Sequence, residues 1–327
     1  FTRILERKIK ISQYLIVRKE IMKTKLILLS LLFSSCSNLT QESESLKIIS
    51  LSTTHTEIIQ SLGAENTLVG VDAFSKVDSL IEVIDAYTVT AEELVPLNAD
   101  FVILAFDFNG IVEELENQDI NYILLPPATT LEDVYSQIKT IGDLVGKKSE
   151  AVSITRDMKL SINRIIKNSN LENIKVYHEI GYSYGIYSVN SDSLIGEIYN
   201  LFSIENIANS NKDPFGSGFP ALSEESVLRA DPDYIVVGHS DYLNKDLSLR
   251  PGWENIKAVK SSKVFFLDEN LANNWGTTTV ELVDTLSDIF KESAQTNPYS
   301  NYFLLISLLF LVTTIMILIK IGIRERV

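Results

Sequence analysis

The segment Gly181–Gly185 has the residue types and the spacing that a serine nucleophile needs. Its sequence, Gly-Tyr-Ser-Tyr-Gly, matches the G-x-S-x-G pattern, and His239 and several aspartates are available in the same half of the chain. Such a serine is activated only where a helix begins directly after it, because that helix provides the sharp turn and the oxyanion amide. Residues 186–191, Ile-Tyr-Ser-Val-Asn-Ser, alternate instead like a strand. We therefore expect no enzyme, and an acyl hydrolase acting through Ser183 is kept only as an alternative.

The three histidines are the other side chains that could take part in chemistry. His55 and His239 each follow a predicted strand, in opposite halves of the chain, where a neutral imidazole could ligate a metal centre. The alternative for both is capping or surface hydrogen bonding. His178 lies within a predicted strand, and its facing is left open. Because Cys36 is the only cysteine, an intrachain disulfide and a thiolate-rich metal site are excluded, and we expect no resident metal or cofactor.

Two acidic helix starts recur along the chain. Residues 90–104 match residues 223–237 without a gap, and each copy is typical of a short capped helix, a turn at an aspartate and a buried strand. The aligned acidic pairs are Glu92 with Glu225 and Asp100 with Asp233. The repeat predicts two similar α/β lobes, each with one acidic helix start.

The capping residues of the two copies differ. In the first copy Thr90 can form a reciprocal capping box with Glu93. In the second copy Ser223 is followed at that spacing by Ser226, which we do not expect to complete a box. The two copies therefore share the acidic pair Glu92 and Glu225, whereas we do not expect them to share the capping box.

Strands and helices alternate between residues 46 and 291, which implies mostly parallel sheets covered by helices. The expected strands are 46–51, 67–71, 101–104, 122–125, 175–180, 234–237 and 264–267. The expected helices are 57–62, 112–117, 131–145, 147–167, 193–202 and 278–291, with a turn at 52–56. In open α/β sheets ligands lie outside the carboxyl ends of the strands. The candidate wall loops are accordingly 52–56, 72–76, 106–110, 181–187, 213–220, 239–242 and 273–277.

Aromatic side chains are concentrated in those loops. Rings add apolar area and stacking, so they suit a large ring-bearing ligand, although each ring could instead be core packing. The loops contain no arginine, and Arg250 lies outside them, which disfavours a strongly acidic ligand. The candidate ligand residues are His55, Phe74, Phe106, Phe108, Tyr182, Tyr184, Tyr187, Phe215, Phe219, His239, Tyr242 and Trp275.

Both ends of the chain carry apolar runs. Residues 22–36 combine a basic start, a short apolar run and small residues before Cys36, as in a bacterial lipoprotein signal that would lipidate this cysteine; a plain export signal is the alternative. Residues 302–319 are uncharged and apolar, long enough to cross a bilayer, with a basic flank after them. We therefore expect a plasma-membrane anchor and an extracytoplasmic soluble region.

Composition and pattern also divide the chain. The formal net charge of −14 argues against a nucleic-acid partner, because phosphate binding needs clustered lysine and arginine. A helical stripe with apolar positions over 147–167 is long enough to join two lobes. The expected segments are an upstream extension at 1–21, the signal at 22–36, a linker at 37–45, an N-terminal lobe at 46–146, a connecting helix at 147–168, a C-terminal lobe at 172–293 and a transmembrane helix at 302–319.

The segment Ile49–Asp72 resembles the opening of the class III substrate-binding proteins of ABC importers, which serve cobalamin, ferric siderophores and haem. Further blocks fall in the family's order and spacing across Lys47–Glu292. They are Glu92–Leu104, the helix at 147–167, Pro220–Val237, Pro251–Lys260 and Lys263–Asp268. The resemblance implies two α/β lobes joined by one long helix, with a ligand cleft between them and limited opening.

The same resemblance implies partners and roles. A permease dimer with its ATPase would receive the ligand, and Glu92 and Glu225 would dock onto permease arginines, because paired carboxylates fix orientation on a symmetric partner. The aromatic loops favour a cobalamin-like corrinoid, with haem or a ferric siderophore as other possibilities. A membrane-anchored sensor or adhesion ectodomain is a further alternative.

Overall fold

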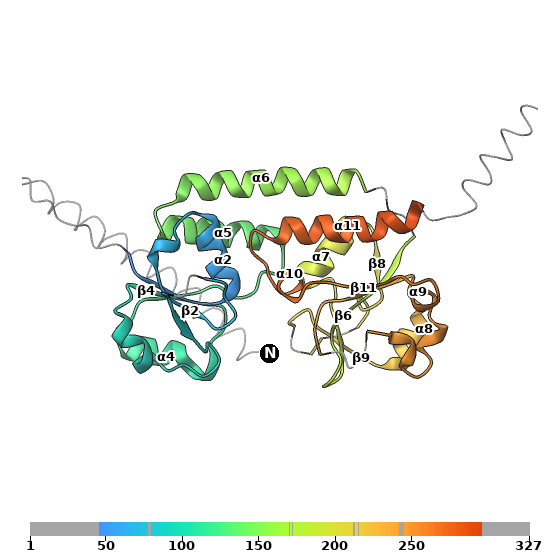
Figure 1. Ribbon diagram of the computed structural model, residues 1–327, viewed down its shortest axis with the longest axis horizontal. Helices are drawn as coiled ribbons and strands as arrows, with labels where there is room; N and C mark the ends of the chain where they lie inside the picture. Colours follow the sequence, from blue (N-terminus) through green and yellow to red (C-terminus); the bar gives the residue numbers. More distant parts are fainter. Residues whose placement is uncertain are drawn as a thin grey trace, which may run out of the picture. The chain divides into compact units, whose positions relative to one another are not determined.

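The computed structural model describes residues 46–295 except 78–79, 170, 172, 212, 215 and 242–244 (Figure 1). The predicted extension, the signal with Cys36, the linker and the apolar run at 302–319 lie outside the described residues. Two candidate ligand residues, Phe215 and Tyr242, lie outside them as well. Within the described part of the chain, no helix is both long enough and apolar enough to cross a membrane.

The first lobe is built on a five-stranded sheet in which every pairing is parallel. Its strand order is β3-β2-β1-β4-β5. The strands are β1 (Ile48–Leu51), β2 (Leu68–Asp72), β3 (Glu82–Ile84), β4 (Phe101–Leu104) and β5 (Tyr122–Leu124). The helices are α2 (Thr53–Ser61), α3 (Ala91–Leu94), α4 (Ile111–Asn117) and α5 (Leu131–Leu144), with short 3₁₀ turns at Glu65–Thr67, Val95–Leu97 and Phe108–Gly110. β1 is buried along its whole length, which explains its nearly continuous apolar sequence.

The second lobe is built on a mixed six-stranded sheet. Its main order is β11-β10-β6-β7-β9, with β8 paired to β6; the β6–β7 and β7–β9 pairings are antiparallel and the others parallel. The strands are β6 (Lys175–Gly181), β7 (Ile186–Ser188), β8 (Glu205–Asn206), β9 (Ala221–Leu222), β10 (Tyr234–Val237) and β11 (Val264–Phe266). The helices are α7 (Leu194–Leu201), α8 (Glu224–Ala230), α9 (Lys257–Lys260) and α10 (Glu269–Ala272), with 3₁₀ turns at Leu247–Leu249 and Trp253–Asn255.

One long helix connects the two sheets along the chain. Helix α6 (Lys148–Lys167) follows α5 and packs on it, and it also packs on α11 (Thr279–Gln295) (Figure 1). At about 30 Å it is long enough to reach from one lobe to the other. Gly142 of α5 allows α5 and α6 to pack closely, because a Cβ at this position would stand 2.5 Å from the Cβ of Ala151 in α6. The predicted single long connecting helix is thus present as α6.

The sequence repeat corresponds to structurally equivalent units. Strand β4 pairs with β1 as β10 pairs with β6, both in parallel. The Asp100 carboxylate accepts from the Lys47 backbone N–H at 2.8 Å, and the Asp233 carboxylate accepts from that of Lys175 at 3.0 Å. Each aspartate therefore closes the same turn onto the start of the neighbouring strand.

Two local expectations were wrong. Ser226 does complete a capping box: its hydroxyl oxygen accepts from the Ser223 N–H, and its N–H donates to the Ser223 hydroxyl, both at 3.2 Å. A serine side chain is thus long enough to close a capping box, for which we expected a carboxylate to be needed. The expected turn at 52–56 is instead the first turn of α2, whose Thr53 and Thr54 hydroxyls bond to Asp72 and Asn274, distant in sequence.

Candidate functional site

Three of the candidate wall loops are held by aspartate carboxylates, those of Asp72, Asp213 and Asp241. Asp72, at the end of β2, accepts from the Phe74 N–H at 2.9 Å and from the Thr53 hydroxyl at 3.1 Å. Asp213 accepts from the N–H groups of Ser217, Gly218 and Phe219. These carboxylates satisfy backbone donors inside the loops, as in an Asx turn. Despite the acidic composition, the loops thus present aromatic rings supported by carboxylates that are already engaged.

Three rings gather in the first lobe. Phe106 and Phe108 stack at a tilt with ring centroids 5.1 Å apart, and Phe108 stacks on Tyr87 at 4.8 Å. The Asn109 side-chain amide fixes this arrangement by donating to the Tyr87 carbonyl at 2.8 Å. Phe106 is 46% exposed and Tyr87 55% exposed. Tyr87 was not among the predicted residues, because it lies between predicted elements with no pattern to single it out.

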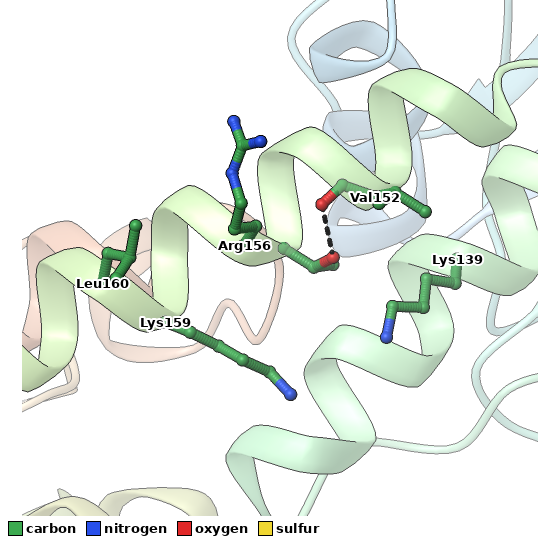
Figure 2. Close-up of a pocket in the computed structure, with 6 residues that line it drawn as sticks. Lys139, Val152, Arg156, Lys159 and Leu160 are labelled. Carbon is green, nitrogen blue, oxygen red and sulfur yellow. Dashed lines mark hydrogen bonds between the residues drawn. The ribbon is translucent and has the colours of Figure 1, made fainter.

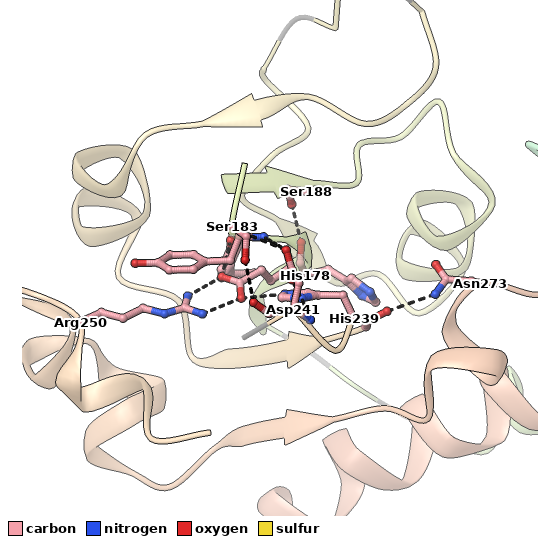
Figure 3. Close-up of polar contacts among 11 residues, drawn as sticks. His178, Ser183, Ser188, His239, Asp241, Arg250 and Asn273 are labelled. Carbon is pink, nitrogen blue, oxygen red and sulfur yellow. Dashed lines mark hydrogen bonds and ion pairs between the residues drawn. The ribbon is translucent and has the colours of Figure 1, made fainter. Parts of the chain in front are cut away.

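The Gly181–Gly185 segment forms the tip of the β6–β7 hairpin. Asp241 holds this tip through the N–H groups of Tyr182 and Ser183, at 3.2 and 2.9 Å. The Ser183 hydroxyl donates to the Asp241 carbonyl at 2.8 Å (Figure 3). The antiparallel strand β7 follows, where a nucleophile elbow would need a helix. The geometry is that of a hairpin presenting Tyr184, which is 96% exposed.

A buried ionic network lies beneath this hairpin. The Arg250 guanidinium donates two bonds to Glu179, at 2.5 and 2.8 Å (Figure 3). The Tyr177 hydroxyl donates to the same carboxylate at 2.9 Å, and His239 Nε2 lies 3.0 Å from it. Glu179 is fully buried and Arg250 is 8% exposed. Two opposite charges in the interior are therefore paired and hydrogen-bonded, as buried charges must be.

This network lowers the pKa of Glu179 and engages the guanidinium of Arg250. Burial raises the pKa of Glu179, but the hydrogen bonds from Arg250 and His239 lower it by more, so its pKa lies below the ordinary value. The guanidinium also stacks 3.7 Å from the ring centroid of Tyr182 and 4.5 Å from that of Trp253. The N–H groups of the Arg250 guanidinium are thus already bonded to Glu179, and its flat face is already stacked on Tyr182 and Trp253.

Sequence reasoning missed this pair. Its one signal was a glutamate inside an otherwise buried strand, because charged residues are almost never fully buried without a partner. The partner, 71 positions away at Arg250, follows no sequence period that links it to Glu179.

The three histidines lie away from open solvent. His55 belongs to α2 and is fully buried, with its Nε2 3.4 Å from the side-chain amide oxygen of Gln137; burial lowers its pKa to about 4. His178 faces α7, where its Nδ1 lies 2.6 Å from the Tyr199 hydroxyl, and burial lowers its pKa to about 3. His239 pairs with Glu179 and Asp241. Each of the three imidazoles is therefore buried and hydrogen-bonded within the protein.

The remaining candidates divide into exposed and packed residues. Phe74 is 67% exposed and Phe219 40% exposed, each at the end of an aspartate-held turn. Trp275 is partly buried: its indole N–H donates to Gln137 at 3.1 Å, and its ring meets His55 edge-on at 6.2 Å. Its role in this structure is a contact between the two lobes.

Glu92 and Glu225 occupy the first turns of α3 and α8 and are exposed. A backbone N–H and the Ser223 hydroxyl lower the pKa of Glu225, so this carboxylate is ionised at neutral pH. Neither side chain is required for its capping box, which uses Glu93 in one copy and Ser226 in the other. Both are available to a partner.

A separate hollow lies between α5 and α6 and is lined by Lys139, Val152, Thr155, Arg156, Lys159 and Leu160 (Figure 2). Two of its cations are paired, Lys159 with Glu132 at 2.9 Å and Arg156 with Asp157 at 3.0 Å. It contains none of the candidate ligand residues, and we assign it no role in binding.

Comparisons with known proteins cover most of the described chain. A family model described as periplasmic binding protein matches residues 48–271. An uncharacterised ABC transporter substrate-binding lipoprotein of Bacillus subtilis is 26% identical over 83% of this chain and 89% of its own length. A cobalamin-binding protein of Halobacterium salinarum is 25% identical over 63% of this chain and 58% of its own length.

Solved structures show the same fold. The apo form of a periplasmic haem-binding protein from Roseiflexus sp. RS-1 superposes with a TM-score of 0.68 at 20% identity, covering 76% of this chain and 99% of that chain.

Proposed function

This chain belongs to the periplasmic binding protein family, and we propose that it is the extracytoplasmic substrate-binding component of an ABC importer, which captures a metal chelate and delivers it to a permease. The family match over residues 48–271 is the observation that carries this proposal. It is supported by the relatives named as a substrate-binding lipoprotein and a cobalamin-binding protein. These relatives are binding proteins, and the hairpin at Gly181–Gly185 is no nucleophile elbow, so the chain is not an enzyme.

The wall chemistry favours a cobalamin-like corrinoid among the possible chelates. Phe74, Phe106 and Tyr184 offer exposed rings for a large ring-bearing ligand. Arg250 is occupied by Glu179, so it does not offer a free fork to a polyanionic siderophore. Haem and ferric siderophores are the other members of the ligand class.

Docking onto the permease would use Glu92 and Glu225. Their matched positions in the sequence repeat and their exposure support this role. Two carboxylates, one on each lobe, suit two positive sites on a symmetric permease dimer, because charge-assisted pairs fix orientation. Attachment to the membrane through Cys36, through residues 302–319, or through both belongs to the same proposal.

Thermal unfolding with a panel of cyanocobalamin, haemin and ferrichrome tests the ligand class. A chelate present at 100 times its Kd adds about 2.7 kcal/mol, which for a unit of this size raises Tm by about 5–10 °C. We expect cyanocobalamin to give such a rise, and Phe106→Ala combined with Tyr184→Ala to reduce it. Leu160→Ala, at another exposed apolar position, on α6, is the control and should leave it unchanged. No rise with any of the three would contradict the proposed ligand class.

A further inference from the structure

The loop between α10 and α11 makes a second junction between the lobes, separate from α6. Residues 274–278 belong to the second lobe by sequence, yet their side chains and backbone bond to α2 and α5 of the first lobe. We infer that Glu57 is the positioning residue of this junction and that it holds the two candidate ligand walls at a fixed separation before any ligand binds.

Glu57 caps the first turn of α11 from the opposite lobe. Its carboxylate accepts from the Thr278 N–H at 3.0 Å, from the Thr278 hydroxyl at 3.1 Å and from the Thr277 hydroxyl. These donors lie just before Thr279, where α11 begins. The first N–H groups of a helix have no partner within it and favour a negative charge. A side chain from the first lobe therefore does the work of an N-cap in the second.

Contacts on both sides of Glu57 extend the junction. Ser61 Oγ lies 2.8 Å from Thr277 Oγ1, one turn further along α2. One turn before it, the Thr54 hydroxyl donates to the Asn274 side-chain oxygen at 3.1 Å. The three α2 residues 54, 57 and 61 share one helical face by their spacing. That face is committed to the other lobe along its length.

Trp275 completes the junction against α5. Its indole N–H donates to Gln137 at 3.1 Å, and its ring meets His55 edge-on. Gly276 leaves room for the arrangement, since a Cβ there would stand 3.2 Å from the Glu57 carboxylate. The aromatic contact and the glycine pack this loop closely onto the first lobe.

Both halves of the junction are rooted in the core. Ile58 and Ile59 of α2 are fully buried, and so are Leu286 and Phe290 of α11. All four belong to one continuous apolar cluster. The two lobes share this cluster, so separating them requires the cluster to open and the Glu57 bonds to break.

The position of α2 places this junction next to the candidate ligand walls of the first lobe. α2 begins directly after β1, at the same carboxyl edge of the sheet from which the wall loops at Phe74 and Phe106 emerge. The inference rests on the proposed function only in calling those loops ligand walls. The contact itself and its test need no ligand.

Double electron–electron resonance on the full chain in detergent tests the inference. Spin labels are placed at Asn117→Cys in α4 and Lys260→Cys in α9, both exposed, with Cys36→Ser to remove the native thiol. We expect one narrow distance distribution without ligand. Glu57→Ala should broaden it about twofold towards longer distances, because the lobes then sample several separations.

Two further variants keep the result decisive. Thr277→Val combined with Thr278→Val removes two donors while leaving Glu57 in place, and should broaden the distribution as well. Ser287→Ala removes a buried hydrogen bond of 2.7 Å between α11 and Ser169, remote from the junction, and should leave it narrow. If both junction variants gave the distribution of Ser287→Ala, the inference would be wrong, whereas ligand binding in the thermal test would still support the proposed function.

Discussion

At the scale of single residues, the candidate site is notable for how its charges are used. Asp72, Asp213 and Asp241 each bond to backbone donors of a wall loop, and Glu179 neutralises Arg250 in the interior. The exposed side chains of these loops include the rings of Phe74, Tyr184 and Phe219. An acidic chain can in this way present binding surfaces suited to a large, largely apolar chelate.

Two buried histidines should make the fold sensitive to acid. Burial lowers the pKa of His55 to about 4 and that of His178 to about 3, so both are neutral in the folded protein near pH 5. The unfolded chain takes up these protons below about pH 6.5. The stability that the two neutral histidines contribute is therefore fully present above about pH 6.5. It is lost as the pH falls from there towards their pKa values in the folded protein, about 4 and about 3.

The free energy of unfolding measured at pH 7 and at pH 4.5 tests this. For His55 alone the expected loss is roughly 2–3 kcal/mol, from 1.36 kcal/mol per pH unit below the unfolded pKa. His55→Gln should remove that part of the fall in the free energy of unfolding between pH 7 and pH 4.5. Ile138→Val, a change at a similarly buried but non-titrating residue of α5, should leave the fall as in the wild type. An unchanged fall in His55→Gln would show that His55 is protonated in the folded state.

At the scale of elements, the wall loops depend on their aspartates. Asp241 holds the hairpin tip through the Tyr182 and Ser183 N–H groups, and Asp213 holds its own turn through Ser217 and Gly218. A hydrogen bond to a charged group contributes about 1.5–3 kcal/mol, and loops are held by few other interactions. Each loop should therefore loosen separately.

Amide hydrogen exchange gives a reciprocal test of this dependence. Asp241→Ala should speed exchange at Tyr182 and Ser183 by about tenfold or more, since 1.4 kcal/mol corresponds to a factor of ten. Exchange at Ser217 and Gly218 should stay unchanged. Asp213→Ala should do the reverse. Equal effects of both variants on both loops would instead indicate general destabilisation.

The sequence predicts the elements better than it predicts the loops. Strands such as Phe101–Leu104 and Tyr234–Val237 are short, apolar and buried on both faces, so composition alone identifies them. The start of α2 was missed because Thr53 and Thr54 bond to residues 19 and 220 positions away. Contacts of that kind follow from the tertiary fold and leave no periodic signal.

The site divides in the same way. Exposed rings at Phe74, Phe106 and Tyr184 were identified from their loops, since the carboxyl ends of strands mark those loops in advance. The Glu179–Arg250 pair was missed because it joins a strand to a distant turn. His55 and Trp275, which were predicted to face a ligand, are buried and half-buried, and they meet edge-on where the two lobes are in contact.

At the scale of the whole molecule, the duplicated unit and the junction have different tasks. The repeat gives each lobe an acidic helix start with Glu92 or Glu225, and the candidate ligand walls that we propose lie in loops outside the repeat. The α6 helix and the Glu57 junction connect the two lobes. In the proposed importer, ligand choice and permease docking thus depend on separate residues and can be altered independently.

Uptake of labelled cyanocobalamin tests the central claim most directly, in cells of the source organism whose own gene for this chain has been removed. Restoring the wild-type chain should restore uptake. Glu92→Lys combined with Glu225→Lys should not, because each carboxylate becomes a repelling cation, although the purified variant should keep the wild-type rise in Tm with cyanocobalamin. Full uptake with the double variant would contradict the docking role, and uptake unaffected by removing the gene would contradict the claim that this chain delivers the chelate to an importer.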